Sequence, residues 1–148
     1  QERNMRGGTE NTQGIVGLAK ALEICYTEMD EHIKHIQGLK NYMKEQLEKI
    51  VPGISFNGET DDDKSLYTVL NCCFPAHKDA EMMLFNLDIA GIMASGGSAC
   101  SSGSNQGSHV LRGIGADQTR ASVRFSFCKY STKEEIDYTL EKIKNMLA

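Results

Sequence analysis

A helical pattern of apolar residues runs through the first third of the chain and constrains its fold more than any other feature. Apolar residues recur near helical spacing from Asn11 to Ile50, and Pro52 and Gly53 stop the pattern. Thr9 or Asn11 is available as the N-cap. The pattern predicts one long or kinked helix of about 38 residues, roughly 57 Å at 1.5 Å per residue. Such a helix is longer than a small domain requires, which indicates that it connects two parts of the protein.

Short segments with strand and helix patterns follow this helix. Strands are expected at 54–57, 66–74, 92–95 and 121–127, and helices at 78–91, 108–115 and 131–148. This order predicts an α+β fold, in which helices pack against a small sheet. We expect two regions, an inter-domain segment with the long helix at 1–50 and a small C-terminal domain at 51–148. Because the chain opens with Gln1 in a polar, glycine-rich stretch, we expect it to be a fragment of a larger protein.

Composition excludes several functional classes. The formal net charge of −4 argues against nucleic-acid binding, which needs a concentrated basic face. No apolar run approaches the roughly 20 residues of a membrane-spanning helix. The five cysteines lack the paired spacing of a disulfide framework or a zinc site, and the four histidines lack metal partners at suitable spacing. We therefore expect a soluble protein in a reducing compartment, the cytoplasm, with no metal site.

The stretch SGGSACSSGSNQGS at 95–108 places Cys100 in the most flexible part of the sequence. Eleven of its fourteen residues are Gly, Ser or Ala, which leave the backbone free and offer the thiol little apolar surface. A thiol there is able to reach one site and withdraw to another. Its nucleophilicity depends on a lowered pKa or a nearby base, neither of which the sequence supplies. The alternative is a flexible linker with an incidental cysteine.

Arg124 lies in a stretch with strict alternation, SVRFSF. Val123, Phe125 and Phe127 share one face of the expected strand and should enter the core, which leaves Arg124 on the other face. Its planar fork suits a carboxylate. A solvated arginine, or one paired with a surface acid, explains the pattern equally well.

The stretch RGGTEN at 6–11 combines two glycines with Thr9 at the start of a helix. Backbone N–H groups and a hydroxyl in this place are able to hold a phosphate. The stretch lacks the lysine of a P-loop, and a plain helix cap would explain it as well.

The remaining cysteines are expected to be packing residues: Cys25, Cys72, Cys73 and Cys128. Several lysines on helices are expected to be solvated charges: Lys20, Lys40, Lys44, Lys49, Lys142 and Lys144.

Taken together, these stretches resemble the cysteine desulfurases of the class V aminotransferase family, specifically the type that serves iron-sulfur cluster assembly and nitrogen fixation. The matching text is MRGGTENTQGIVGLAKA at 5–21, SGGSACSSGS at 95–104, SHVLRGIG at 108–115 and ASVRFSFCKYSTKEEID at 121–137. The resemblance covers nearly the whole chain. It implies the C-terminal domain of a fold-type I transferase that depends on pyridoxal 5'-phosphate.

The resemblance also implies a role for each candidate residue. Cys100 would be the nucleophile that takes sulfur from L-cysteine as a persulfide, releases L-alanine, and delivers the sulfur to an acceptor or an iron-sulfur scaffold protein. Arg124 would bind the substrate carboxylate. Thr9 would contact the cofactor phosphate of the neighbouring subunit in a homodimer. No lysine here has the context of the family's Schiff-base lysine, so we expect the chain to be inactive alone.

Three other functions remain open. A selenocysteine lyase would use the same fold. A non-catalytic sulfur-carrier or scaffold-docking module would keep Cys100 without binding a cofactor, although it would need neither RGGTEN nor Arg124. A redox switch built on Cys100 would need a resolving cysteine nearby.

Overall fold

The computed structural model describes residues 5, 7–77, 82–96 and 108–147. Its contacts divide the chain into two units, 1–33 and 34–148. The boundary falls inside helix α2 (Met29–Ile50). The expected division into 1–50 and 51–148 stays a prediction.

The N-terminal unit consists of helix α1 (Thr12–Thr27) and the first residues of α2 (Met29–Ile50). The expected long helix is therefore interrupted at Glu28, whose backbone N–H caps the end of α1 by donating to Ile24 O. Asn11 is the N-cap, and its side chain accepts from Gly14 N at 3.0 Å. No residue of α1 is buried. The apolar residues on the expected stripe, such as Ile15 and Leu18, are 57% and 72% exposed, so the structure provides no core for this helix.

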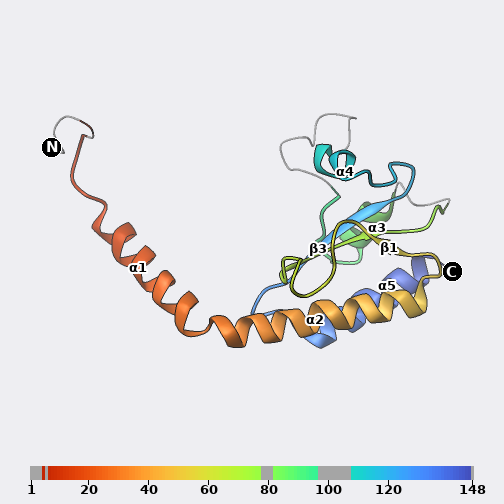
Figure 1. Cartoon of the computed structure of the whole chain (residues 1–148), viewed down its shortest axis with the longest axis horizontal. Coiled ribbons are helices and arrows are strands. Elements are labelled where there is room, and N and C mark those ends of the chain that lie inside the picture. Colours follow the sequence, from red (N-terminus) through yellow and green to blue (C-terminus); the bar gives the residue numbers. More distant parts are fainter. Residues whose placement is uncertain (1–4, 6, 78–81, 97–107, 148) are drawn as a thin grey trace. The chain divides into compact units, whose positions relative to one another are not determined.

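The C-terminal unit is built on a three-stranded antiparallel sheet in the order β1-β2-β3 (Figure 1). The strands are β1 (Ser55–Phe56), β2 (Val69–Cys73) and β3 (Ser122–Ser126), and the helices after α2 are α3 (Met83–Ile89), α4 (His109–Gly113) and α5 (Lys133–Met146). The α+β fold with a small sheet is confirmed. The strand expected at 92–95 is wrong, because only Ser95 pairs there, in an isolated bridge to Arg124.

One face of the sheet carries the hydrophobic core. Residues of α2, α3 and α5 pack against the inward side chains of β2 and β3, and fully buried members of this core include Leu47, Leu70, Leu87, Val123 and Ile143. The alternating pattern of β3 fits a sheet with one covered face, since successive side chains point to opposite sides.

Local signals fix the ends of the helices in this unit. Thr132 and Glu135 form a capping box at the start of α5, and Ser108 caps α4. Gly91 closes α3 with a φ of 76°, a left-handed conformation that glycine adopts without strain.

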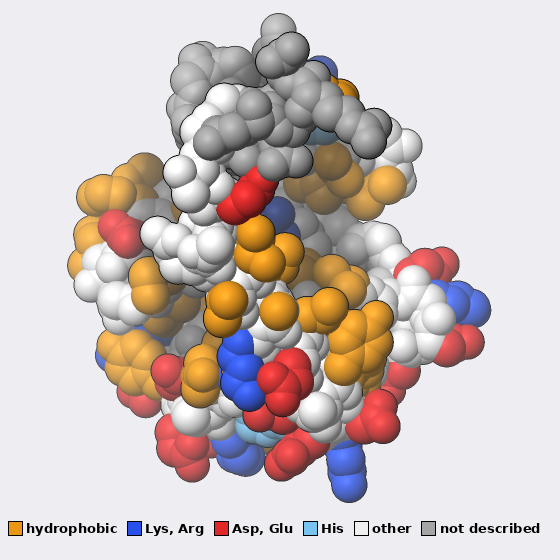
Figure 2. Space-filling model, turned by 90° about the vertical axis from the view of Figure 1, so that its left-hand side faces the viewer, with side chains coloured by type: hydrophobic (Ala, Val, Ile, Leu, Met, Phe, Trp, Pro, Cys, Tyr) orange, Lys and Arg blue, Asp and Glu red, His pale blue; other side chains and the backbone are white. Residues whose placement is uncertain are grey.

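Hydrophobic side chains also remain on the surface, as the orange patches in Figure 2 show. The most exposed large ones in the C-terminal unit are Met93 at 94%, Tyr130 at 78% and Ile89 at 70%. The described residues include no helix that is both long and apolar enough to span a membrane.

Candidate functional site

Arg124 occupies the centre of β3, on the face of the sheet opposite the core. Its side chain is exposed, whereas Val123 and Phe125 beside it are 1% and 5% exposed. The expected alternation is therefore confirmed: the phenylalanines enter the core and the arginine does not.

Two chain segments flank Arg124. Asn71 of β2 lies directly opposite it, and Ser95 pairs with it from the other side. Arg124 N donates to Ser95 O at 2.7 Å, and Ser95 N donates to Arg124 O at 3.1 Å. Because Ser95 takes both backbone groups of Arg124, Asn71 and Arg124 form a non-hydrogen-bonded cross-strand pair. In such pairs the Cα atoms approach to about 4.5 Å and the side chains lie close together.

A network of neutral polar groups covers the sheet next to Arg124. Asn57, which follows β1, donates from Nδ2 to Asn71 Oδ1 at 2.9 Å and to Ser122 Oγ at 3.0 Å. Its backbone N–H also donates to Asn71 O at 2.9 Å. We call Asn57, Asn71, Ser122 and Arg124 the polar face. Sequence analysis missed both asparagines, although the alternation of Asn71 with buried Leu70 and Cys72 was a usable signal.

The guanidinium of Arg124 has no internal counter-ion among the residues that the structure describes. The ion pairs found there join Lys20 to Glu23, His32 to Glu28, Lys64 to Asp61 and Lys133 to Asp137. An exposed arginine without a carboxylate partner keeps its planar set of donors for an external anion.

Cys100 lies outside the described residues, but both flanks of its segment are described. Ser95 pairs with Arg124 on the N-terminal side. The next residue, Gly96, lies so close to α3 that an added Cβ would overlap Leu84 Cδ1. On the C-terminal side, Ser108 Oγ accepts from Leu111 N at 3.4 Å and starts α4. The segment that carries Cys100 therefore begins beside Arg124.

Thr9 is exposed in the N-terminal unit, ahead of α1. Gly8 before it has a φ of 88°, and the first turn of α1 carries no acidic residue. Exposed backbone at a helix start, together with a hydroxyl, is a donor set that fits a phosphate. Because Thr9 and Arg124 belong to different units, their separation is not defined, and the cofactor role of Thr9 stays a prediction.

Three sequence-based expectations about single residues are wrong. Lys40 is not a solvated charge, because only 1% of it is exposed. Its Nζ donates to Ser65 Oγ at 2.6 Å and to Leu66 O at 3.0 Å. Burial lowers the pKa of its amine, an effect that the charge of Asp62 opposes.

The other two concern cysteines. Cys25 and Cys128 are exposed and are not packing residues, whereas Cys72 and Cys73 are buried as expected. The described cysteines are all free thiols. Burial raises the pKa of the Cys72 thiol.

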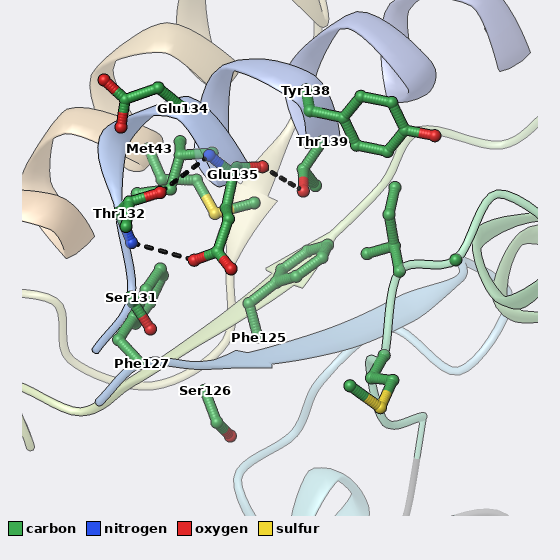
Figure 3. A pocket seen from close by; sticks show the side chains of 14 residues that line it. Met43, Phe125, Ser126, Phe127, Ser131, Thr132, Glu134, Glu135, Tyr138 and Thr139 are labelled. Carbon is green, nitrogen blue, oxygen red and sulfur yellow. Dashed lines mark hydrogen bonds between the residues drawn. The ribbon is translucent and has the colours of Figure 1, made fainter. Parts of the chain in front are cut away.

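A cavity of about 460 Å³ lies on the core side of the sheet, beside the first turn of α5 (Figure 3). Met43, Phe125 and Phe127 contribute to its apolar lining. The carboxylate of Glu135 is already engaged, since Oε2 accepts from Thr132 N at 2.9 Å. Arg124 does not line the cavity, which we therefore treat as separate from the polar face. Within the described ranges, no three His, Cys, Asp or Glu side chains are grouped as metal ligands.

Comparisons with known proteins agree on one family. The family model described as "Aminotransferase class-V" matches residues 1–139. The chain is 38% identical to "Cysteine desulfurase IscS" of Dictyoglomus turgidum over 149 residues, covering 99% of the chain and 37% of that protein. It is 41% identical to "Cysteine desulfurase" of Nostoc sp. over 143 residues, covering 95% of the chain and 35% of that protein.

Solved structures of NifS-like proteins have the same fold as this chain. A "NIFS-LIKE PROTEIN" matches with a TM-score of 0.77 and 34% identity, over 99% of this chain and 36% of that one. A NifS-like protein from Rickettsia africae matches with a TM-score of 0.76 and 25% identity, over 99% of this chain and 37% of that one. The chain thus spans little more than a third of these relatives.

Proposed function

Because the chain belongs to the class-V aminotransferase family, we propose that it is part of a cysteine desulfurase that depends on pyridoxal 5'-phosphate. The enzyme moves sulfur from L-cysteine to Cys100 as a persulfide and releases L-alanine. The sulfur then passes to an acceptor or to an iron-sulfur scaffold protein. The names of the relatives support this reaction class, since the curated ones are called cysteine desulfurases.

The transfer balances without an external oxidant. The Cys100 thiolate attacks the substrate sulfur, so that a sulfur–sulfur bond forms while the Cβ–S bond of the substrate breaks. The β-carbon takes up a proton, and the sum is L-cysteine plus thiol giving L-alanine plus persulfide. The cofactor, when bound, supplies the electron sink for cleavage of the carbon–sulfur bond.

The chain's own residues bind and orient the reactants. Arg124 donates to both oxygens of the substrate α-carboxylate, which fixes the position of the sulfur relative to the attacking thiolate. Thr9 donates to the cofactor phosphate of the neighbouring subunit in a homodimer. Because a segment of small residues leaves the backbone free, Cys100 is able to take sulfur at the substrate and present it to the acceptor.

The observation that carries this proposal is the pairing of Ser95 with Arg124. It joins the start of the Cys100 segment to the strand that carries Arg124, which has no counter-ion within the described part of the chain. A sulfur-carrier module would need the thiol but not a carboxylate-binding arginine beside it.

The proposal extends to the state of the protein in the cell. We expect the chain alone to be inactive, because no lysine in it has the context of a Schiff-base lysine, and we expect the homodimer to reside in the cytoplasm. A reducing compartment suits the free thiols of the described cysteines.

The decisive experiment uses the full-length protein, loaded with cofactor and given L-cysteine labelled with sulfur-35. Alanine release and protein-bound persulfide are measured for wild type, Cys100→Ser and Cys128→Ser, the last being a matched control because Cys128 is an exposed free thiol. We expect Cys100→Ser alone to lose both products. Unchanged alanine release and unchanged protein-bound persulfide in that variant would exclude the nucleophile assignment.

A further inference from the structure

We propose that Asn71 is a positioning residue for Arg124 and that its neutral amide keeps the guanidinium available to the substrate carboxylate. This inference rests on the proposed role of Arg124 in binding that carboxylate. It adds a residue that sequence analysis did not single out, and it explains why the centre of the polar face carries amides and a hydroxyl without a carboxylate.

The register of the sheet makes Asn71 the cross-strand neighbour of Arg124. Asn71 is the residue of β2 directly opposite Arg124, and the pair is of the non-hydrogen-bonded kind, because Ser95 takes both backbone groups of Arg124. Side chains directly opposite in such a pair have Cβ atoms about 4.5–5.5 Å apart. The side chain of residue 71 is thus the cross-strand neighbour that limits how the first carbons of the arginine side chain lie.

Hydrogen bonds from Asn57 hold the amide of Asn71 in place. Asn57 Nδ2 donates to Asn71 Oδ1 and to Ser122 Oγ, while the backbone N–H of Asn57 donates to Asn71 O. Both side-chain bonds of Asn57 are partly buried, which protects them from exchange with water. The oxygen end of the Asn71 amide is therefore committed to Asn57, and the Nδ2 end, a donor, faces away from it.

The charge of residue 71 affects whether the Arg124 guanidinium is available to an anion. Because Asn57 occupies the amide oxygen of Asn71, the other polar group of this side chain is a donor, which offers a guanidinium no acceptor and does not compete with an external anion. An aspartate of nearly the same shape would place a carboxylate directly opposite the arginine, where opposite charges attract. The guanidinium would then be paired internally, and the substrate carboxylate would have to displace that partner.

The test measures kcat and KM for L-cysteine in the full-length, cofactor-loaded protein. We expect Asn71→Asp to raise KM about tenfold, which corresponds to the loss of one charge-assisted hydrogen bond, with kcat nearly unchanged. Asn71→Ser removes the amide without adding charge and should raise KM by a smaller factor. Gln118→Glu is the matched control, since it adds the same charge at an exposed position off the polar face and should leave KM unchanged.

Arg124→Gln separates the proposed role of Arg124 from the proposed role of Asn71. If Arg124→Gln leaves KM unchanged, the proposed role of Arg124 fails and the inference fails with it. If Arg124→Gln raises KM while Asn71→Asp and Asn71→Ser do not, only the role of Asn71 is overturned. If both Asn71 variants show a lower kcat, a higher KM and a lower thermal midpoint, the role of Asn71 is purely structural. That result would also overturn the inference. Should Asn71→Asp fail to fold, the KM of Asn71→Ser decides alone.

Discussion

Ser95 and Arg124 exchange both of their backbone hydrogen bonds, at 3.1 and 2.7 Å, although 29 positions separate them in the sequence. The pair attaches the beginning of the Cys100 segment to β3. An interaction between two backbones does not depend on the side chain of residue 124, so substitutions of Arg124 should test its chemistry without releasing the segment.

Arg124→Lys keeps the positive charge and removes the planar fork. Because lysine cannot bind a carboxylate through two parallel N–H groups, we expect KM for L-cysteine to rise about tenfold and the urea midpoint to stay within error. Steady-state kinetics and urea unfolding of the full-length protein measure the two effects. Arg112→Lys, at another exposed arginine, is the matched control. A KM equal to that of wild type would contradict the assignment of Arg124.

Gly96→Ala should destabilise the protein through one identified overlap. The new Cβ would meet Leu84 Cδ1, and overpacking of this kind costs about 1–3 kcal/mol unless the neighbour moves. Urea unfolding measures the loss, and the expected value lies at the lower end because Leu84 is only partly buried.

Two further variants check this explanation. Gly113→Ala is the control, since an added Cβ there meets nothing within 4 Å and α4 favours alanine over glycine. In the double variant Gly96→Ala with Leu84→Ala, the loss due to Gly96→Ala should largely disappear. Strictly additive losses would show that the overlap with Leu84 is not the cause.

The sequence predicted the side of the sheet on which Arg124 lies, because a strand alternates every two residues and SVRFSF has only one register that buries both phenylalanines. The capping box of Thr132 and Glu135 is likewise a local feature, since the two residues are neighbours on one helical turn. Features set by local geometry are thus readable from one segment.

Features that depend on contacts between distant segments were not predicted from the sequence. Lys40 has the sequence context of a surface lysine, and its acceptors lie 25 and 26 positions further along the chain. Asn71 gains its importance from the strand opposite it, and a sequence alone does not define that register. The segment at 92–95 looks like a strand, yet only Ser95 meets a partner.

Lys40 should make stability depend on pH in the alkaline range. Burial lowers the pKa of its amine in the folded protein below the ordinary lysine value of 10.5, so between the two pKa values the unfolded chain binds more protons than the folded one. The free energy of unfolding should therefore rise with pH through that window, relative to Lys40→Met. Urea unfolding from pH 7 to pH 10.5 tests this, with Lys49→Met at an exposed position of α2 as the control. A difference between wild type and Lys40→Met that stays flat or falls would contradict the prediction.

Cys128 should be the more reactive of the two exposed cysteines in the described part of the chain. Hydrogen bonds from the backbone of Tyr130 and from the side chain of Ser131 lower the pKa of its thiol, and the Ser131 Oγ to Cys128 Sγ distance is 3.7 Å. The thiolate is the nucleophile, so iodoacetamide at pH 7.5 should label Cys128 faster than Cys25 and should leave buried Cys72 unlabelled.

Ser131→Ala should slow the labelling of Cys128 severalfold, because it removes the only side-chain bond among the three hydrogen bonds that lower the pKa of this thiol. Ser126→Ala, an exposed serine on β3, should not change the rate. Labelling is followed by peptide mass spectrometry, which resolves each cysteine. Equal rates for Cys128 in wild type and Ser131→Ala would show that the side-chain hydrogen bond does not activate the thiol. The result also affects the persulfide assay, because a reactive Cys128 is able to accept sulfur nonspecifically. The persulfide on Cys100 is then measured in the Cys128→Ser variant.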